Sequence, residues 1–365
     1  MLKTLNIKNL TVFPEADFEF SPGLNVIIGE NGTGKTHLLK LGYLFSNAWH
    51  DLVKDQSAVS EQKIQSYFSE RLRHLFKPDK IGSLTTTGSD GKTELSCTLV
   101  GSIPTISIRM PHEPQPQPLA DELVWQMAFS NRSKQHVNVD RMVRNADYGK
   151  AVYLPCKEMV SFFEGFLALY EKHELQFDET YKDLALYLST PKLKTAPAMI
   201  QEALADLSSD VGGRLILDGG KFYLVSNGSK RREITLVAEG IRKIVTLLHL
   251  IENGSLAEGD TLFWDEPESN LNSKLIRAVA AAIFGLCNSG VQVIIATHSL
   301  FLLRELEILA SRSEHEGVRQ RYFALERSEA LVAVHQGNTI DDVDPVVMLD
   351  EDLLQSDRFM ALGDS

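Results

Sequence analysis

The chain has 365 residues, of which 43% are hydrophobic and 24% are charged. These values are typical of globular proteins and exclude global disorder. The 37 Lys and Arg residues against 49 Asp and Glu residues give a net charge of −12. Coating of nucleic acid through bulk charge is therefore excluded, although two local windows, 71–80 and 132–150, are basic.

The cysteines and the N-terminus indicate a cytoplasmic protein. Cys97, Cys156 and Cys287 lie too far apart for a metal-binding motif or a disulfide framework, so we interpret them as buried, reduced thiols. The sequence starts without a signal-peptide pattern, and no apolar run approaches the ~20 residues of a membrane-spanning helix.

The N-terminal part predicts strands around a first pair of helices. Alternating apolar and polar residues, or short apolar runs, are typical of strands. Strands are expected at 2–12, 16–20, 24–28, 92–100 and 105–110, and helices from Lys35 and over 57–76. Four prolines within 111–118 exclude a helix or a central strand there and favour an exposed loop, with a proline-rich docking motif as the alternative.

The C-terminal part alternates strands and helices, which predicts an α/β class for the whole chain. Residues 156–210 read as mainly helical, and 214–226 as a hairpin. Further helices are expected at 235–251, 273–287 and 300–310, and further strands at 261–264, 291–296, 322–325 and 330–335.

A phosphate-binding motif follows the buried strand at 24–28. Residues 29–36 read Gly-Glu-Asn-Gly-Thr-Gly-Lys-Thr and fit the P-loop pattern G-x-x-x-x-G-K-[ST]. Its glycines let backbone N–H groups surround phosphates, Lys35 supplies a cation to the β- and γ-phosphates, and the Thr36 hydroxyl suits Mg²⁺. The predicted ATP-binding residues here are Gly29, Asn31, Gly32, Thr33, Gly34, Lys35, Thr36 and His37.

Two carboxylates end the predicted strand at 261–264. Asp265 is predicted to hold Mg²⁺, and Glu266 to act as the general base that polarises the attacking water. His298 follows the next predicted strand, at the sheet edge where open α/β folds bind ligands. A neutral imidazole there would contact the γ-phosphate and hold the water. We therefore name Lys35, Glu266 and His298 as the catalytic residues.

These motifs together resemble an ABC-type ATPase head. The order of P-loop, Asp-Glu-Pro, Asn-Leu and Thr-His-Ser is closer to the SMC, RecF and OLD class than to transporter subunits. The stretches 153–162, 177–188 and 237–251 resemble stand-alone prokaryotic AAA-family ATP-binding proteins found in phage-defence loci. The resemblance implies an ABC-type P-loop head with a mixed β-sheet core, ATP and Mg²⁺ as cofactors, and ATP hydrolysis.

The resemblance also implies a signature loop that reaches the nucleotide of a second subunit. The matching residues are Ala238, Glu239 and Gly240, which open a predicted helix. Ala238 stands where the family usually has a serine, so a hydroxyl is missing from this loop. Arg242 or Lys243 could compensate, with a solvated helix face as the plainer interpretation.

Four segments follow from these assignments. We expect the P-loop half of the ATPase core at 1–110, a mainly helical lobe at 111–212, the half with signature, carboxylates and histidine at 213–340, and an acidic C-terminal segment at 341–365. The lobe is too short and lacks the heptads of a long coiled-coil arm. The junction between core and lobe is expected near 155–158, with no single residue indicated.

The implied function is a nucleotide-gated switch. Two heads would enclose two ATP·Mg²⁺, and a partner effector, a nuclease or a toxin encoded nearby, would read the closed state in anti-phage defence. The alternative is a RecF-like ATPase in DNA repair or DNA-structure sensing, with the windows 71–80 and 132–150 as contacts. A third class uses ATP only as a structural clamp.

The segment 341–365 carries eight carboxylates and one arginine. Apolar residues interspersed among them predict that it packs against something. A solubilising end, a DNA mimic, an autoinhibitory tail and a partner or dimer surface all remain open interpretations.

Overall fold

The computed structural model describes residues 1–53, 60–89, 91–102, 120–142, 148–173, 175–193, 205–226, 230–328 and 331–362. The strands are β1 (Leu2–Leu10), β2 (Phe13–Glu19), β3 (Leu24–Gly29), β4 (Lys92–Ser102), β5 (Ala120–Ser130), β6 (Asn138–Met142), β7 (Ala151–Leu154), β8 (Gly213–Asp218), β9 (Lys221–Ser226), β10 (Arg231–Glu233), β11 (Thr261–Asp265), β12 (Gln292–Thr297), β13 (Gln320–Ser328) and β14 (Leu331–Gly337). The α-helices are α1 (Lys35–Val53), α2 (Glu61–Phe76), α3 (Phe166–Lys172), α4 (Glu179–Leu188), α6 (Ala205–Val211), α7 (Glu239–Glu252), α8 (Ser273–Asn288), α9 (Leu300–Ala310) and α10 (Val347–Ala361).

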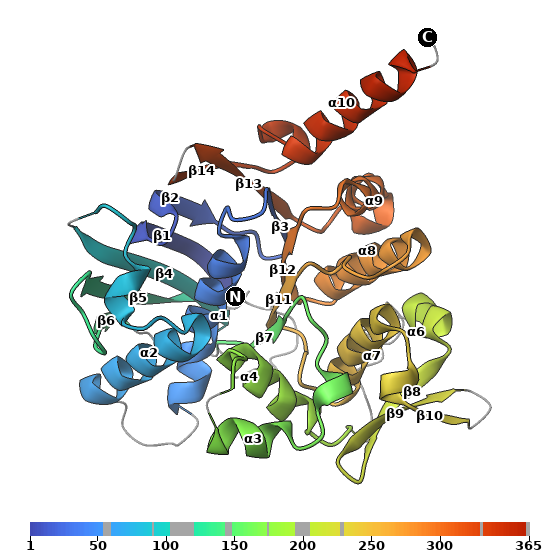
Figure 1. Ribbon diagram of the computed structural model, residues 1–365, viewed down its shortest axis with the longest axis horizontal. Helices are drawn as coiled ribbons and strands as arrows, with labels where there is room; N and C mark the ends of the chain where they lie inside the picture. Colours follow the sequence, from blue (N-terminus) through green and yellow to red (C-terminus); the bar gives the residue numbers. More distant parts are fainter. Residues whose placement is uncertain are drawn as a thin grey trace, which may run out of the picture.

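The central sheet has the strand order β14-β13-β3-β12-β11-β7. All neighbours are parallel except β13 and β14, so the carboxyl ends of β3, β12, β11 and β7 share one edge. Strands β3, β7, β11 and β12 are buried throughout, as expected of parallel strands covered on both faces. Helices α8 and α9 lie beside this sheet on one side, and α1 on the other (Figure 1).

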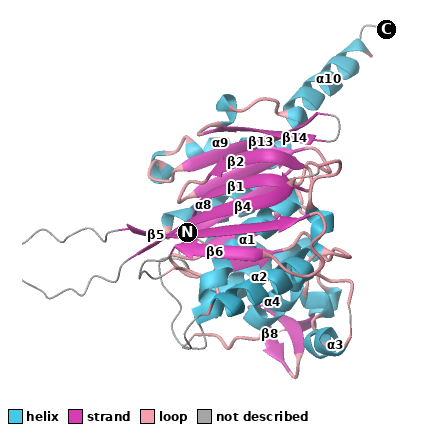
Figure 2. Cartoon of the chain, turned by 90° about the vertical axis from the view of Figure 1, so that its left-hand side faces the viewer, coloured by secondary structure: helices cyan, strands magenta, loops and turns pink. Residues whose placement is uncertain are grey.

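A second, antiparallel sheet has the order β2-β1-β4-β5-β6 (Figure 2). Its apolar face packs with α1 and α2 in one hydrophobic core that includes Phe18, Phe68 and Trp125. Strands β5 and β6 fall in the range 111–212, where we expect a mainly helical lobe, and they extend this sheet instead. The strand expected at 105–110 and the proline-rich stretch 111–118 lie outside the described residues.

The helices of the lobe begin only after β7. Helices α3, α4, α6 and α7 pack with a small sheet, β10-β9-β8, which contains the expected hairpin. Within the described residues the longest helix is α1 with 19 residues, so no coiled-coil arm is found in that part of the chain.

Arg71 lies inside the molecule, which corrects our expectation for the first basic window. Its guanidinium is 2.7 Å from Asp183 and 3.1 Å from Glu179, two carboxylates of α4, and lies over the ring of Tyr43. Tyr43 belongs to α1, so this buried network joins the helix that starts at the P-loop to the lobe. A solvent-exposed role in DNA binding is therefore wrong for Arg71.

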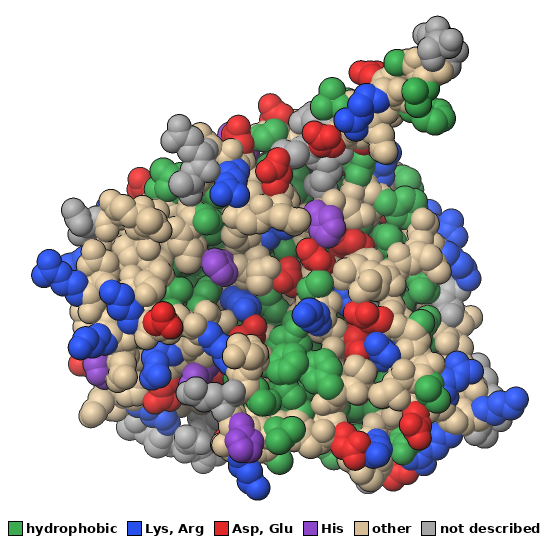
Figure 3. All heavy atoms as spheres, in the orientation of Figure 1, with side chains coloured by type: hydrophobic (Ala, Val, Ile, Leu, Met, Phe, Trp, Pro, Cys, Tyr) green, Lys and Arg blue, Asp and Glu red, His purple; other side chains and the backbone are tan. Residues whose placement is uncertain are grey.

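Helix α10 stands away from the body, with hydrophobic side chains exposed along it (Figure 3). Phe359 is 77% exposed and Met360 66%. Val343 and Val346 anchor the preceding segment in the core, and Arg304 pairs with Asp352 at 3.1 Å. We expected this segment to pack. Within the single chain, the described side chains of α10 remain largely exposed instead.

None of the helices within the described residues combines the length and the apolar character that a membrane span requires.

Candidate functional site

The P-loop connects β3 to α1 and curves tightly. Gly29, Gly32 and Gly34 have φ angles of 151°, 81° and 89°, a region that favours glycine. A Cβ on Gly34 would lie 2.8 Å from a methyl of Val12 and 2.9 Å from the ring of Phe13. The hydroxyl of Thr33 donates to the Glu30 carbonyl at 2.8 Å and holds the turn from within. The loop is therefore preformed for backbone binding of phosphate.

Lys35 is folded against this loop. Its ammonium group donates to the carbonyl oxygens of Gly29 at 2.7 Å and Glu30 at 2.8 Å, and the residue is only 7% exposed. Burial lowers the pKa of Lys35, whereas the nearby carboxylates Glu266 and Asp265 oppose that shift. The ammonium group of Lys35 thus lies directly against the P-loop backbone, where a cation suits a phosphate-binding loop.

Thr36 and Asp265 meet across the sheet edge. The Thr36 hydroxyl donates to Oδ2 of Asp265 at 2.8 Å, and the buried Tyr153 hydroxyl lies 3.5 Å from the same oxygen. Burial raises the pKa of Asp265, and the bond from Thr36 lowers it in part. A hydroxyl and a carboxylate at this distance are hard oxygen donors of the kind that Mg²⁺ takes, so the two predicted metal ligands fit the ion.

Glu266 occupies a constrained position directly after β11. Its φ is 49°, uncommon for a residue with a Cβ, and its backbone N–H donates to the Ala296 carbonyl of β12 at 2.9 Å. One carboxylate oxygen is 3.3 Å from Nδ1 of His298, and the other accepts a hydrogen bond from the thiol of Cys156 at 3.1 Å. Both oxygens are therefore oriented by neighbouring side chains.

Glu268 supports the histidine. It is buried and accepts a hydrogen bond from the Thr297 hydroxyl at 2.7 Å and from the His298 backbone N–H at 3.3 Å. The His298 ring itself is half exposed, with Nδ1 also 3.7 Å from Glu268. The structure thus brings His298 and Glu266 together, as predicted from their places at the ends of neighbouring parallel strands.

The signature-like loop ends at the start of α7. Ala238 is the N-cap residue, is exposed and makes no side-chain cap, and Leu236 beside it is 72% exposed. Gly240 is buried against the segment that follows Glu266. A Cβ there would lie 2.7 Å from the Asn270 carbonyl oxygen and 2.6 Å from a methyl of Leu271.

Two cations of α7 point inward. Lys243 is buried and donates to the carbonyl oxygens of Glu266 at 3.4 Å and Ser269 at 3.3 Å, and to the Ser269 hydroxyl. Arg242 pairs with Glu158 at 2.8 Å and donates to the Val237 carbonyl. A solvated helix face is therefore wrong for both residues. Lys243 connects α7 to the loop 266–269, which we call the catalytic loop after the role predicted for Glu266.

The other predicted site residues make fewer contacts with Asp265, Glu266 and His298. The ring of His37 packs against Phe76 of α2, with the ring centroids 5.4 Å apart, so a contact of this residue with phosphate would come from its backbone. Asn31 and Gly32 are exposed at the tip of the loop. Glu239, in the first turn of α7, is half-buried.

The sequence alone does not indicate that Tyr153, Cys156, Lys243 and Ser269 contact Asp265 or Glu266. A parallel pairing of β7 with β11 would have indicated Cys156, but the four-residue strand β7 gives too weak a signal for its register. Lys243 reads as an ordinary helix cation because burial of its ammonium group depends on tertiary packing.

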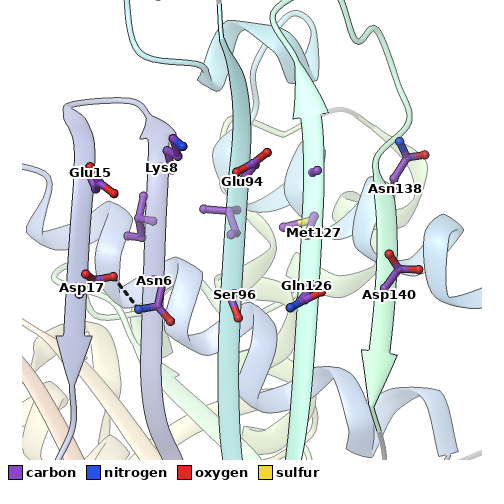
Figure 4. A pocket seen from close by; sticks show the side chains of 13 residues that line it. Asn6, Lys8, Glu15, Asp17, Glu94, Ser96, Gln126, Met127, Asn138 and Asp140 are labelled. Atoms are coloured by element: carbon purple, nitrogen blue, oxygen red, sulfur yellow. Dashed lines mark hydrogen bonds between the residues drawn. The ribbon is translucent and has the colours of Figure 1, made fainter.

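A separate hollow of about 450 Å³ lies on the outward face of the antiparallel sheet. Figure 4 shows its polar side chains, which come from β1, β2, β4, β5 and β6. Carboxylates of Glu15, Asp17, Glu94 and Asp140 outnumber the single cation of Lys8. This acidic face is distinct from the P-loop and does not suit a nucleic-acid backbone.

The strand order, with the P-loop, the two carboxylates and the histidine at one edge of the sheet, defines a P-loop ATPase of the ABC type. A family model described as "AAA domain, putative AbiEii toxin, Type IV TA system" matches residues 24–304, more than half of the chain. The chain therefore belongs to this family. A second model, described as an AAA domain, matches residues 4–41.

Solved structures confirm the expected fold class. The Smc head bound to the C-winged helix domain of ScpA aligns over 93% of this chain and 98% of that chain, with a TM-score of 0.51. The two sequences are 14% identical, so the likeness shows the fold alone.

Curated relatives match only a short part of the chain. The DNA replication and repair protein RecF of Renibacterium salmoninarum is 42% identical over 55 residues, which is 15% of this chain and 14% of that protein. RecF of Streptococcus uberis is 30% identical over 80 residues, 22% of this chain and 21% of that protein. This chain therefore matches less than a quarter of the length of these relatives.

Proposed function

We propose that this protein binds ATP with Mg²⁺ and hydrolyses it slowly as a regulatory switch. One observation carries the proposal. The carboxylate of Glu266 lies at the end of buried β11, directly after Asp265, whose oxygen is 2.8 Å from the P-loop hydroxyl of Thr36. A base, a metal-binding pair and a phosphate loop thus share one sheet edge, as phosphoryl transfer requires.

Each residue has a distinct task in this scheme. Backbone N–H groups of the P-loop and Lys35 hold the β- and γ-phosphates, while Thr36 and Asp265 would hold Mg²⁺, which neutralises phosphate charge when bound. Glu266 accepts a proton from the attacking water, and His298 orients that water and contacts the γ-phosphate.

Hydrolysis is tested by ATP turnover of the wild-type protein and Glu266→Gln. The amide keeps the size of the side chain but is no base, so kcat should fall by roughly 100-fold or more while ATP still binds. A Glu266→Gln protein with wild-type kcat would overturn the assignment. If the wild-type protein itself retains ATP with almost no turnover, ATP serves as a structural clamp instead.

A pair of heads is the second part of the proposal. The exposed Leu236 and Ala238, which precede α7, would face the P-loop of a second copy and complete its γ-phosphate site. Ala238 brings no hydroxyl to that contact, so backbone N–H groups of the α7 N-terminus would take its place.

Control of a partner effector in anti-phage defence is the third part. It is supported by the family description, which mentions a toxin and a toxin–antitoxin system. Cells expressing this protein together with its neighbouring gene should plate fewer phages than cells with Glu266→Gln and the same gene. Equal plating across a broad phage panel would contradict the defence role.

DNA binding is the second candidate function, and one observation favours it. The backbone N–H groups of Ile81 and Gly82 donate to the carbonyl oxygens of Lys134 and Ser133, so the two basic windows lie side by side. The exposed Lys and Arg residues of the two windows include Arg73, Lys77, Lys80, Arg132 and Lys134. Duplex DNA should then stimulate ATP turnover in a strongly salt-dependent way, and turnover unaffected by DNA at low salt would exclude this role.

A further inference from the structure

The thiol of Cys156 lies inside the catalytic site and has no part in the scheme above. Strands β7 and β11 run in parallel, and their register pairs Leu154 with Trp264. Cys156 is two residues beyond Leu154, and Glu266 is two residues beyond Trp264. The pairing of two short strands therefore sets the cysteine opposite the catalytic carboxylate.

The contacts of Cys156 are directed at the catalytic loop. Its Sγ donates to Oε2 of Glu266 at 3.1 Å and lies 3.7 Å from the Ser269 hydroxyl. The Ser269 hydroxyl donates in turn to the Glu266 carbonyl at 2.9 Å and receives a hydrogen bond from Lys243. These hydrogen bonds fix the backbone of the loop at Glu266. The side-chain torsions of Glu266 are then set by its contacts with His298 and Cys156.

The thiol acts as a donor at neutral pH. Burial, together with the contact to Glu266, raises the pKa of Cys156 to about 11, so the sulfur keeps its proton. A protonated thiol is a poor nucleophile and a weak hydrogen-bond donor. Its chemistry here is therefore orientation of a carboxylate and not covalent catalysis.

We propose that Cys156 is a positioning residue that holds the carboxylate of Glu266 in its hydrolytic orientation. The inference rests on the proposed role of Glu266 as the general base. One carboxylate oxygen is fixed by the thiol, so the other is presented beside His298 at 3.3 Å, where the attacking water would lie. Without the thiol, Glu266 samples further rotamers, and fewer bound ATP molecules meet a correctly placed base.

The test compares kcat, KM and ATP affinity for three substitutions at this position. Cys156→Ala and Cys156→Val remove the donor, and Val nearly keeps the volume, whereas Cys156→Ser restores an O–H donor. Cys287→Ala, at a partly buried cysteine of α8, is the matched control. A fluorescent ATP analogue measures binding, and thermal unfolding identifies any variant that has lost its fold.

The two variants without a donor should lose about 3- to 10-fold in kcat, as expected for one weak hydrogen bond to a charged group, with KM and ATP affinity unchanged. Cys156→Ser should recover most of the rate, and Cys287→Ala should match the wild type. A folded Ala or Val variant with wild-type kcat, or an equal loss in Ser and Ala, would overturn the inference.

The Glu266→Gln protein distinguishes a wrong role for Cys156 from a wrong proposed function. If Glu266→Gln is inactive and Cys156→Ala retains full kcat, only the role of Cys156 is wrong. If Glu266→Gln hydrolyses ATP at the wild-type rate, the proposed base is wrong and the inference falls with it.

Discussion

The P-loop edge and the signature-like loop differ in how far their side chains contact the rest of the chain. At the P-loop edge, Lys35, Thr36 and Glu266 each contact other residues of the same site within one chain. At the signature-like loop, Ala238 is an exposed N-cap without a side-chain bond, and Leu236 is 72% exposed. The side chains of the first region are therefore held by contacts within one chain, whereas the second region presents exposed side chains, as the proposed contact with a second copy requires.

Lys243 connects these two regions. Its side chain extends from α7, the helix that follows the signature-like loop. Its ammonium group donates to the carbonyl oxygens of Glu266 and Ser269. In the proposed pair of heads, a movement of α7 would therefore reach the backbone of Glu266 through one buried side chain.

Breaking this connection is expected to have the largest effect among the changes considered next. Lys243→Met keeps the aliphatic stem but removes the hydrogen bonds, so kcat should fall roughly tenfold or more, while the ATP affinity of the P-loop remains. The measurement is steady-state turnover with a separate ATP titration. Lys8→Met, on the outer sheet face, is the matched control. Equal kcat in both variants would show that the hydrogen bonds of Lys243 do not affect ATP turnover.

A side chain at Gly240 should disturb the packing of the signature helix. Gly240→Val places its Cβ 2.7 Å from the Asn270 backbone oxygen, so α7 must shift, at a cost of about 1–3 kcal/mol in the free energy of unfolding. Denaturant unfolding measures the loss. The same variant should fail to associate on ATP, and a variant with wild-type stability would contradict the close approach.

Placing a serine at position 238, as in the usual signature pattern, should stabilise the start of α7 in the signature-like loop. In Ala238→Ser the hydroxyl can cap the N-terminus of α7, because the φ of −58° and ψ of 141° suit an N-cap residue. The expected gain is about 1 kcal/mol in the free energy of unfolding, together with tighter ATP-dependent association. Weaker association in Ala238→Ser would show that this loop has been adapted to alanine.

A change on α10 should have the smallest effect on the ATPase. Phe359 is 77% exposed, so Phe359→Asp should shift the free energy of unfolding by no more than about 0.5 kcal/mol and leave kcat unchanged. Thermal unfolding and turnover test this. A large loss in either would show that α10 packs on the ATPase head in solution.

Local sequence signals predict which residues meet at the P-loop edge wherever those residues lie on strong motifs. The G-x-x-x-x-G-K-[ST] motif predicts the P-loop glycines, and the ends of two strands predict Asp265, Glu266 and His298, because parallel strands deliver their carboxyl ends to one edge. The helices and strands from α7 to β14 also lie close to their predicted ranges.

Tertiary contacts decided the rest. Arg71 reads as a surface cation in a basic window, but two carboxylates of α4 and two tyrosine rings surround it in the fold. Strands β5 and β6 fall in a range expected to be helical, because β5 is fixed by its pairing with β4 across the long connection 103–119 and β6 pairs in turn with β5. The contact of Cys156 with Glu266 needs the register of β7, which no local pattern specifies.

The most direct test of the account is the mass in solution of the Glu266→Gln protein, with and without ATP and Mg²⁺. This variant should bind ATP and remain in the closed state. We predict that ATP·Mg²⁺ doubles the mass and that Gly240→Val in the same background prevents the change. A mass that stays constant while ATP saturates the P-loop would contradict the composite site formed by two copies.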